Sequence, residues 1–390
     1  MNNHPHRAIV ATRVYAPEGT AAAYRLEQLT AALSSRGYSV TVFTTKSPGG
    51  PPSTDRVRRW PVLRDKSGSV RGYLQYASFD IPLFFRLLFA PRAELVVVEP
   101  PPTTGLVARA ALAIRRIPYF YYSADVTSAA VKTIQAPSMV IKAVTAMERF
   151  VLNGARGVLA VSEGVHSELR ELMTDDSKVT VVGTGVDTSI YRPDGPQSDV
   201  QTPYFVYAGT MSEFQGSEVF VEAFVRIARK HPTVRLMMFG GGVDVEKLKK
   251  LAIPVSDRVD FLGFVDSEVV ASHLRGAQAG LASVRPGLGY DFAIPTKALV
   301  SVACGTPLIF AGVGPVRDIT KAHSLGWAVD WEVSQVAQAM LEAASVTKPT
   351  LPEETVNWMA EHYSLQAAAS RACAAITHSI DSSTLKYGRQ

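Results

Sequence analysis

The segment VRPGLGYDFAIPTKALVSV, residues 284–302, contains the residue best suited to chemistry, Lys297. A strand pattern ends near Arg285, and Pro295 with Thr296 is typical of the first positions of a helix. A lysine there lies at the positive end of the helix dipole, which costs a few tenths of a kcal/mol. A bound anion would offset that cost and gain from both charges. Lys297 is therefore a candidate phosphate-binding residue; the alternative is an exposed lysine that only favours solubility.

Two glycine-containing segments follow strand patterns, one in each half of the chain. YAPEGTAAAYR, residues 15–25, has Gly19 followed by Thr20, but it lacks the G-x-G-x-x-G spacing of dinucleotide-binding loops. It is either a loop whose backbone approaches a ligand or an ordinary turn with Thr20 as the helix N-cap. FGGG, residues 239–242, has three glycines whose entropic cost suggests a close backbone approach. The approaching group is either the phosphate or sugar of a ligand, or a packed helix.

Two carboxylates follow strand patterns in the first half. Asp125 in YYSADVTS lies at the carboxyl end of a strand, where doubly wound sheets place ligand-contacting groups. It could orient or deprotonate an acceptor hydroxyl, or it could cap a helix. Glu163 in VSEG carries the same two alternatives.

A basic stretch, RVRRWPVLRDKSGSVR at residues 56–71, precedes the apolar helical pattern FDIPLFFRLLFA at residues 79–90. It has six basic residues, one acid and Trp60. Such a pair could dock on anionic lipid headgroups and admit a lipid-linked acceptor. The alternative is a solvated loop followed by a core helix.

Apolar strand patterns alternate with helical patterns through most of the chain, which predicts parallel sheets covered on both faces. In the first half the strand patterns are residues 7–15, 38–45, 93–100, 117–123, 156–162 and 178–183. In the second half they are residues 204–209, 233–240, 259–264, 279–284 and 306–312. A Gly-, Pro- and Asp-rich stretch between the halves has neither period. We therefore predict an α/β chain with two doubly wound, Rossmann-like domains.

The predicted boundaries are a first domain at residues 1–185, a linker at 186–203, a second domain at 204–350, and terminal helices at 351–390 that pack on the first domain. A length of 390 residues agrees with two domains rather than one core.

Composition narrows the class of protein. An apolar content of 47% with 19% charged residues indicates a globular chain. The net charge of +5 suits anionic ligands or an anionic membrane surface, and it is compatible with nucleic acid, which we do not expect as a partner. Cys304 and Cys373 have no Cys or His at metal spacing, which favours a reducing cytoplasm. We expect neither a signal peptide nor a membrane-spanning helix.

Six blocks in order carry a resemblance to the family-4 retaining glycosyltransferases of the GT-B fold, in particular their bacterial cell-surface-polysaccharide branch. The blocks are PEGTAAAYRLEQLTAALSSRGYSVTVFT, ARGVLAVSEGVHSELRE, VVGTGVDTSIYRP, YAGTMSEFQGSEVFVEAF, VDFLGFVDSEVVASHLRGAQAGLASVRP and IPTKALVSVACGTPLIFAG. The string G-x-G-V-D-x-x-x-[FY]-x-P is the most specific of these motifs.

The resemblance implies a UDP- or GDP-sugar donor held by the second domain, with no prosthetic group and no essential metal. It implies these donor-side residues: Gly209, Thr210, Gln215, Gly240, Gly241, Gly263, Phe264, Val265, Pro295, Thr296 and Lys297. The nucleobase would lie against Gly263–Val265, and the diphosphate would meet Lys297. A glycan, lipid-linked or small-molecule acceptor would lie near Gly19, Thr20 and Asp125, with Glu163 also on that side.

The sequence departs from the family at its charged positions. Thr210 and Gln215 stand where an Arg and a Lys are usual, and Phe292 and Val300 align with the paired glutamates. Asp291 is one residue from the first of these. The departures leave open whether activity is lowered or the donor is changed.

Three functions remain. The first is a retaining hexosyl- or N-acetylhexosaminyltransferase. The second is a nucleotide-sugar epimerase of the same fold, and the third is a catalytically weak partner subunit.

Overall fold

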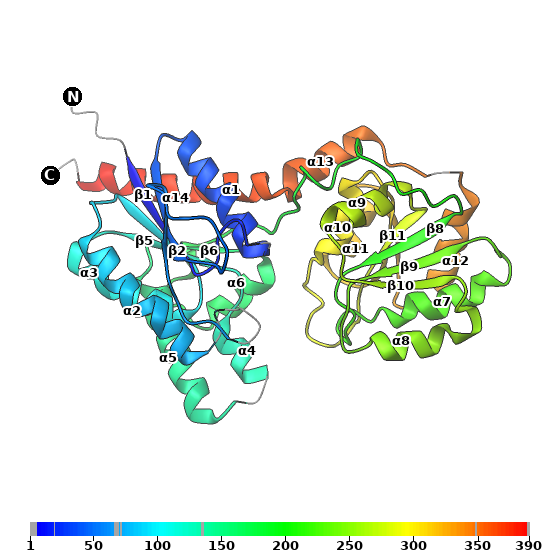
Figure 1. The fold of residues 1–390 in the computed structure, drawn as a ribbon, viewed down its shortest axis with the longest axis horizontal. Helices are drawn as coiled ribbons and strands as arrows, with labels where there is room; N and C mark the ends of the chain where they lie inside the picture. The colour runs from blue at the N-terminus through cyan, green and yellow to red at the C-terminus, as the bar shows by residue number, and fades with distance from the viewer. Residues whose placement is uncertain are drawn as a thin grey trace. The chain divides into compact units, whose positions relative to one another are not determined.

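The computed structural model describes residues 6–18, 20–65, 70, 72–133, 136–347 and 349–387. The chain divides into two compact units (Figure 1). The first domain comprises Met1–Thr184 with Leu365–Gln390, and the second comprises Gly185–Ser364. Each is built on one parallel sheet, which confirms the predicted pair of Rossmann-like α/β domains.

The first domain has a seven-stranded sheet in the order β3-β2-β1-β4-β5-β6-β7. Its strands are β1 Arg7–Ala11, β2 Ser39–Thr45, β3 Val57–Trp60, β4 Leu95–Val98, β5 Tyr119–Ser123, β6 Gly157–Ala160 and β7 Val179–Val181. Its helices are α1 Ala21–Ser35, α2 Tyr73–Phe89, α3 Pro102–Arg115, α4 Thr127–Thr133, α5 Ser138–Gly154, α6 Glu163–Arg170 and α14 Leu365–Tyr387.

Helices cover both faces of this sheet. On one face α2, α3 and α5 bury an apolar core that includes Phe79, Leu112 and Val151. On the other face α1 and α14 pack side by side and bury Leu29 and Ile376 (Figure 1). Strands that are apolar on both faces, such as β4, follow from this double cover.

The second domain has a six-stranded sheet in the order β10-β9-β8-β11-β12-β13. Its strands are β8 Tyr204–Ala208, β9 Arg235–Phe239, β10 Val259–Gly263, β11 Ala279–Val284, β12 Leu308–Gly312 and β13 Gly326–Val329. Its helices are α7 Glu218–Ala228, α8 Val245–Ala252, α9 Ser267–Gly276, α10 Thr296–Ala303, α11 Pro315–Ala322, α12 Val333–Ser345 and α13 Glu353–Tyr363. In this order β8 and β11 are neighbours, so the loops after them leave the same edge of the sheet.

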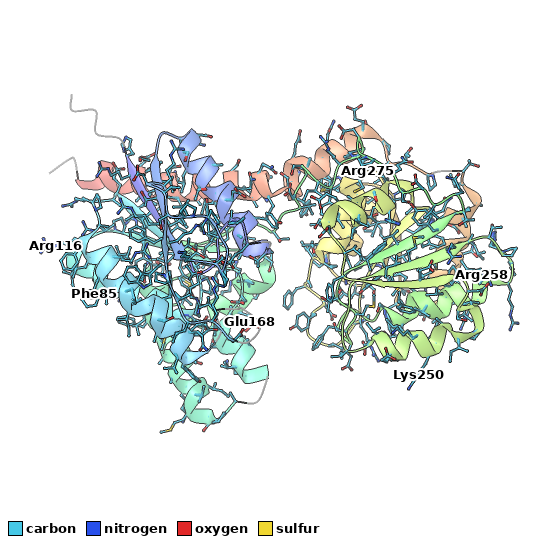
Figure 2. All side chains as sticks on the ribbon, viewed as in Figure 1. Phe85, Arg116, Glu168, Lys250, Arg258 and Arg275 are labelled. Carbon is cyan, nitrogen blue, oxygen red and sulfur yellow. The ribbon has the colours of Figure 1, made fainter. Side chains whose placement is uncertain are left out.

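The predicted domain boundaries differ from the structure in two places. Residues 186–203 were expected to be a linker, but they pack on the second domain. Arg275 lies on α9 (Figure 2). Its guanidinium donates hydrogen bonds to the carbonyls of Ile190, Arg192 and Pro196, at 2.6–2.8 Å. The terminal helices were expected to pack together on the first domain from residue 351. Instead α13 packs on α10 of the second domain, and the chain returns to the first domain at Leu365.

The basic stretch contains a short edge strand rather than only a loop. Within it, β3 pairs in parallel with β2; residues 66–69 and 71 lie outside the described part. Charged side chains suit such an edge, because they discourage pairing with other strands. The following helix, α2, buries one apolar face and exposes another. No helix among the described residues is long and apolar enough to cross a membrane.

Candidate functional site

The carboxyl edge of the second sheet is closed by backbone contacts between successive strand-end loops. The amide of Gly209 donates to the carbonyl of Phe239, and that of Gly240 donates to the carbonyl of Gly263, at 3.0 and 2.7 Å. Gly240 has φ +105° and Gly242 has φ +152°. A Cβ at Gly240 would lie 2.2 Å from the Gly209 carbonyl oxygen, and one at Gly242 would be closer still to Met211. Close packing between loops is therefore sufficient to account for these two glycines.

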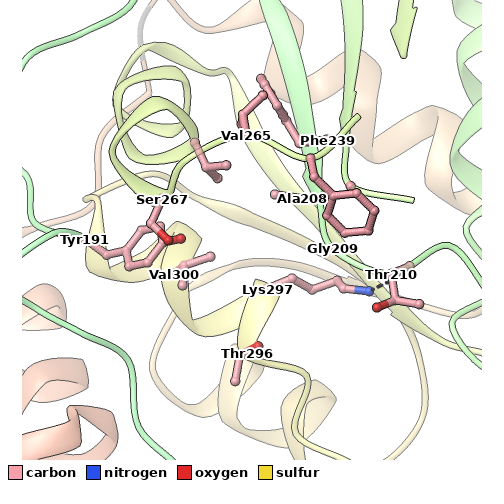
Figure 3. Close-up of a pocket in the computed structure, with 13 residues that line it drawn as sticks. Tyr191, Ala208, Gly209, Thr210, Phe239, Val265, Ser267, Thr296, Lys297 and Val300 are labelled. Atoms are coloured by element: carbon pink, nitrogen blue, oxygen red, sulfur yellow. Dashed lines mark hydrogen bonds between the residues drawn. The ribbon is translucent and has the colours of Figure 1, made fainter. Parts of the chain in front are cut away.

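Lys297 lies in the first turn of α10, whose N-cap is Pro295, and its side chain turns back across this edge. Its Nζ donates to Gln215 Oε1 at 2.6 Å and to Tyr207 Oη at 2.7 Å. A third, longer bond of 3.3 Å reaches the carbonyl of Thr210 (Figure 3). All three partners are neutral oxygens, so no carboxylate compensates the ammonium.

Burial without a compensating charge disfavours the protonated amine, and it lowers the pKa of Lys297 to about 7. The Tyr207 ring face, 4.5 Å from Nζ, adds a cation–π contact. An anion placed here would restore the ammonium, because an opposite charge favours the charged form.

Beside Lys297 is a cavity of about 240 Å³ (Figure 3). Its lining contains no carboxylate. The residues that line it are Tyr191, Ala208, Gly209, Thr210, Phe239, Gly240, Phe264, Val265, Ser267, Val270, Thr296, Lys297 and Val300. Seven of the eleven donor-side residues implied by resemblance thus share one cavity: Gly209, Thr210, Gly240, Phe264, Val265, Thr296 and Lys297. The other four flank it.

Those four have separate places in the structure. Gln215 holds Lys297, as described above, and Pro295 caps α10. Gly263 ends β10 with φ +68°. Gly241 lies under the Phe264 ring, since a Cβ there would be 2.8 Å from that ring. Phe264 itself is 87% exposed, which leaves its other face open.

The two aligned glutamate positions differ in their surroundings. Val300 lines the cavity, whereas Phe292 is exposed on the loop before α10 and does not line it. Asp291 does not point a free carboxylate at the cavity, because it accepts the amide hydrogen of Gly287 at 3.1 Å. It therefore holds its own loop.

The acceptor-side residues lie on the first domain. Thr20 is the N-cap of α1, and its hydroxyl accepts from Ala23 N at 3.2 Å, as the ordinary-turn alternative predicts; Gly19 lies outside the described residues. Glu163 begins α6, but the cap is Ser162. Both residues are exposed.

Asp125 follows β5 at the carboxyl edge of the first sheet and is exposed. It does not cap α4: the buried carboxylate of Glu148 accepts the amides of Thr127 and Ser128 instead, at 2.9 and 2.8 Å. Neighbouring protein atoms partly desolvate Asp125 and raise its pKa, while Arg25 opposes that rise. Within the part of the chain that the structure describes, its carboxylate has neither a hydrogen bond nor an ion pair.

Sequence reasoning missed a buried ion pair at this edge. Glu99, at the end of β4, accepts from Arg25 Nη2 at 2.5 Å and from the hydroxyl of Thr12 at 2.8 Å. Glu99 is 6% exposed. The signal was present as an acid directly after the apolar run LVVV, but nothing near it in sequence revealed the arginine 74 residues earlier.

In a comparison with known proteins, each half of the chain matches the model of a protein family. A "Glycosyl transferase 4-like domain" matches residues 20–185, and "Glycosyl transferases group 1" matches residues 202–345. Both halves belong to glycosyltransferase families. The GT-B chain is 27% identical, over 207 residues, to a GDP-mannose-dependent α-(1-6)-phosphatidylinositol monomannoside mannosyltransferase of Mycobacterium tuberculosis. That match covers 50% of this chain and 54% of the relative, so the chain spans about half the length of the curated relatives it matches.

Solved structures share the GT-B fold across the whole chain. Sucrose-phosphate synthase from Thermosynechococcus elongatus matches with a TM-score of 0.69 and 17% identity, covering 97% of this chain and 100% of that one. Anabaena HepE in complex with UDP and glucose matches with a TM-score of 0.63 and 14% identity, covering 96% and 100%. At these identities the likeness concerns fold alone.

Proposed function

We propose that the protein is a retaining glycosyltransferase that moves a hexose or N-acetylhexosamine from a UDP- or GDP-sugar to an acceptor hydroxyl. The acceptor is a glycan, a lipid-linked sugar or a small molecule. The observation that carries this proposal is Lys297, a half-buried cation held only by neutral oxygens beside a carboxylate-free cavity. Such a site favours an anionic ligand, and the glycosyltransferase families of both domains make a nucleotide diphosphate the natural one.

In this mechanism the diphosphate leaves toward Lys297 and the N-terminus of α10. Charge develops on the leaving oxygen in the transition state, and one preorganised donor stabilises such a charge by about 3–4 kcal/mol. The described residues contain no group of three His, Cys, Asp or Glu side chains that could hold a metal. We assign the neutralising role to Lys297, whose Nζ has only neutral partners, and to the N-terminus of α10. Asp125 would orient or deprotonate the acceptor hydroxyl.

The test is the affinity for UDP and GDP by calorimetry. Lys297→Ala should lower the affinity for the nucleotide that the wild type binds by roughly ten- to hundredfold, because a charge-assisted hydrogen bond to a buried anion is lost. Lys250→Ala, on the outer helix α8, is the matched control and should bind as the wild type does (Figure 2). Equal affinity in both variants would contradict the phosphate site. Release of an epimerised donor sugar without acceptor would favour the epimerase instead.

We further propose a cytoplasmic enzyme that touches the membrane through residues 56–90. In support, Ile81, Phe85 and Phe89 recur every four residues on α2 and are 59, 53 and 79% exposed. Binding to phosphatidylglycerol vesicles, but not to phosphatidylcholine vesicles, should be lost in the double variant Phe85→Ser, Phe89→Ser. Equal binding by that variant would rule out this contact.

A further inference from the structure

Three aromatic rings lie exposed on two loops at the carboxyl edge of the second sheet. Phe214, on the loop after β8, has its ring centroid 4.5 Å from that of Tyr290. Tyr290 in turn stacks on Phe292 at 6.2 Å with 20° between the planes. The three residues, here called the aromatic platform, are 37, 43 and 43% exposed. Single exposed apolar residues are ordinary, but contiguous rings indicate a binding surface.

Local hydrogen bonds hold the aromatic platform in place. The Arg285 amide donates to the carbonyl of Phe214 at 3.0 Å and joins the two loops. Within the second loop, Ala293 N donates to the carbonyl of Tyr290 at 2.8 Å, and Asp291 accepts from Gly287. The rings are therefore ordered before any ligand arrives, which reduces the entropy lost on binding.

The aromatic platform is continuous with the proposed phosphate site. Phe214 directly precedes Gln215, whose side-chain oxygen lies 2.6 Å from Lys297 Nζ. The loop that carries Tyr290 and Phe292 runs into Pro295, the N-cap of the helix that bears Lys297. A group attached to a diphosphate at Lys297 would therefore lie beside these same two loops.

The chemistry of the three rings indicates which kind of group, attached to the diphosphate, they could bind. Aromatic faces carry partial negative charge and attract weakly positive C–H groups, as on the apolar side of a pyranose or on a methyl. Apart from the Tyr290 hydroxyl they offer no hydrogen-bond partner to sugar hydroxyls. The carboxylate between Tyr290 and Phe292, that of Asp291, is held by its own loop.

We propose that the aromatic platform binds the sugar ring of the donor, and that it selects a sugar carrying a methyl group, either 6-deoxy or N-acetyl, over a fully hydroxylated hexose. This inference rests on the proposed function, since it needs a nucleotide sugar at Lys297. Phe292 and Tyr290 are then specificity-determining residues.

The experiment measures the sugar gain, defined as the dissociation constant of the bare nucleotide diphosphate divided by that of the nucleotide sugar. The matched pairs are UDP-N-acetylglucosamine with UDP-glucose, and GDP-6-deoxymannose with GDP-mannose. In the wild type the methyl-bearing member of one pair should show the larger gain. A difference within the UDP pair would identify an N-acetyl sugar, and a difference within the GDP pair would identify a 6-deoxy sugar. Phe292→Ala and Tyr290→Ala should each lower that gain by roughly five- to tenfold, while the bare diphosphate binds within about twofold of wild type.

Phe264→Ala is the matched control, because Phe264 is exposed on another loop that lines the cavity. It should weaken diphosphate and nucleotide sugar alike and leave the gain unchanged. A gain that survives in both Phe292→Ala and Tyr290→Ala overturns the proposal, as does equal gain for the two members of both pairs. Loss of self-association in these variants with an unchanged gain would instead make the platform a protein contact. Failure of both bare diphosphates to bind wild type would refute the proposed function, and this inference with it.

Discussion

Arg25 and Lys297, basic residues at the carboxyl edges of the first and second sheets, differ in how their charge is compensated. At the first edge Arg25 and Glu99 pair at 2.5 Å, and Thr12 satisfies the second carboxylate oxygen. At the second edge Lys297 has three oxygen partners and no carboxylate. The charge of Arg25 is neutralised by Glu99, whereas the charge of Lys297 is left for a ligand to neutralise.

The difference shows why a shared fold does not give two equivalent sites. Parallel sheets place loops at both edges, but only the side chains decide which ligand can bind there. In the proposed mechanism Asp125, at the first edge, works on a neutral hydroxyl. Lys297, at the second, attracts an anion and stabilises a leaving diphosphate.

The largest expected effect concerns the role of Asp125. Asp125→Asn should lower kcat by about a hundredfold or more, because an amide cannot accept the proton of the acceptor hydroxyl. The affinity for nucleotide diphosphate should stay unchanged, since that ligand belongs to the second domain. Transfer rate and diphosphate affinity are measured on the same preparation. If kcat stays within about threefold of wild type, Asp125 has no role in the chemistry.

Breaking the internal pair at the first edge should cost stability. Arg25→Met leaves the Glu99 carboxylate buried without its cation, and the free energy of unfolding should fall by about 3 kcal/mol. Lys297→Met removes a cation that no charge compensates, so its effect should stay within about 1 kcal/mol. Thermal unfolding without ligand compares the two variants. Similar midpoints would show that the two edges do not differ in the way described.

Making the second edge resemble the first should weaken donor binding. In Gln215→Glu a carboxylate would replace the amide oxygen now 2.6 Å from Lys297 Nζ. The new pair would neutralise the ammonium, and we expect diphosphate affinity to fall by about tenfold or more. Gln215→Met is the control that removes the contact without adding charge, and it should bind more tightly than Gln215→Glu. The reverse order of affinities would contradict the charge argument.

The sequence predicted the alternating architecture because apolar strands and helical periods are local signals. It did not predict β3, since a four-residue edge strand with two arginines is held by backbone pairing with β2 and not by apolar residues. It placed α13 on the wrong domain because nothing in a helical, Ala-rich tail indicates where the chain leaves one core for the other. That change occurs at Ser364 and Leu365.

At the site, the position of Lys297 could be predicted from the helix start, but its partners could not. Tyr207 lies inside the apolar strand β8, where its pattern is that of any core residue. Only the fold shows that its hydroxyl meets Lys297. The platform was missed for a related reason: Phe214 and Tyr290 are 76 positions apart in sequence, and their contact depends on β8 lying beside β11.

A further expected effect is a pH dependence that only the second edge should show. With the free Lys297 pKa near 7 and a higher pKa in the complex, diphosphate binding takes up a proton above pH 7. The dissociation constant should therefore rise by up to about tenfold per pH unit between pH 7 and 8.5. Neither Tyr207 nor the phosphate should titrate in that window: burial raises the pKa of Tyr207 well above its usual value, and phosphate is already ionised above its second pKa of about 6.

Lys297→Arg fixes the charge and should flatten this pH dependence, because a guanidinium stays protonated throughout. The stability of the ligand-free protein should change with pH in the opposite direction to the diphosphate affinity. An unfolded lysine, with its ordinary pKa of 10.5, binds its proton more tightly than the buried one, so Lys297 makes stability rise with pH above 7. Calorimetry in buffers of different ionisation enthalpy counts the protons directly. A wild-type affinity that is flat from pH 7 to 8.5 would mean that Lys297 is already charged without ligand, and that the two edges are less different than their contacts indicate.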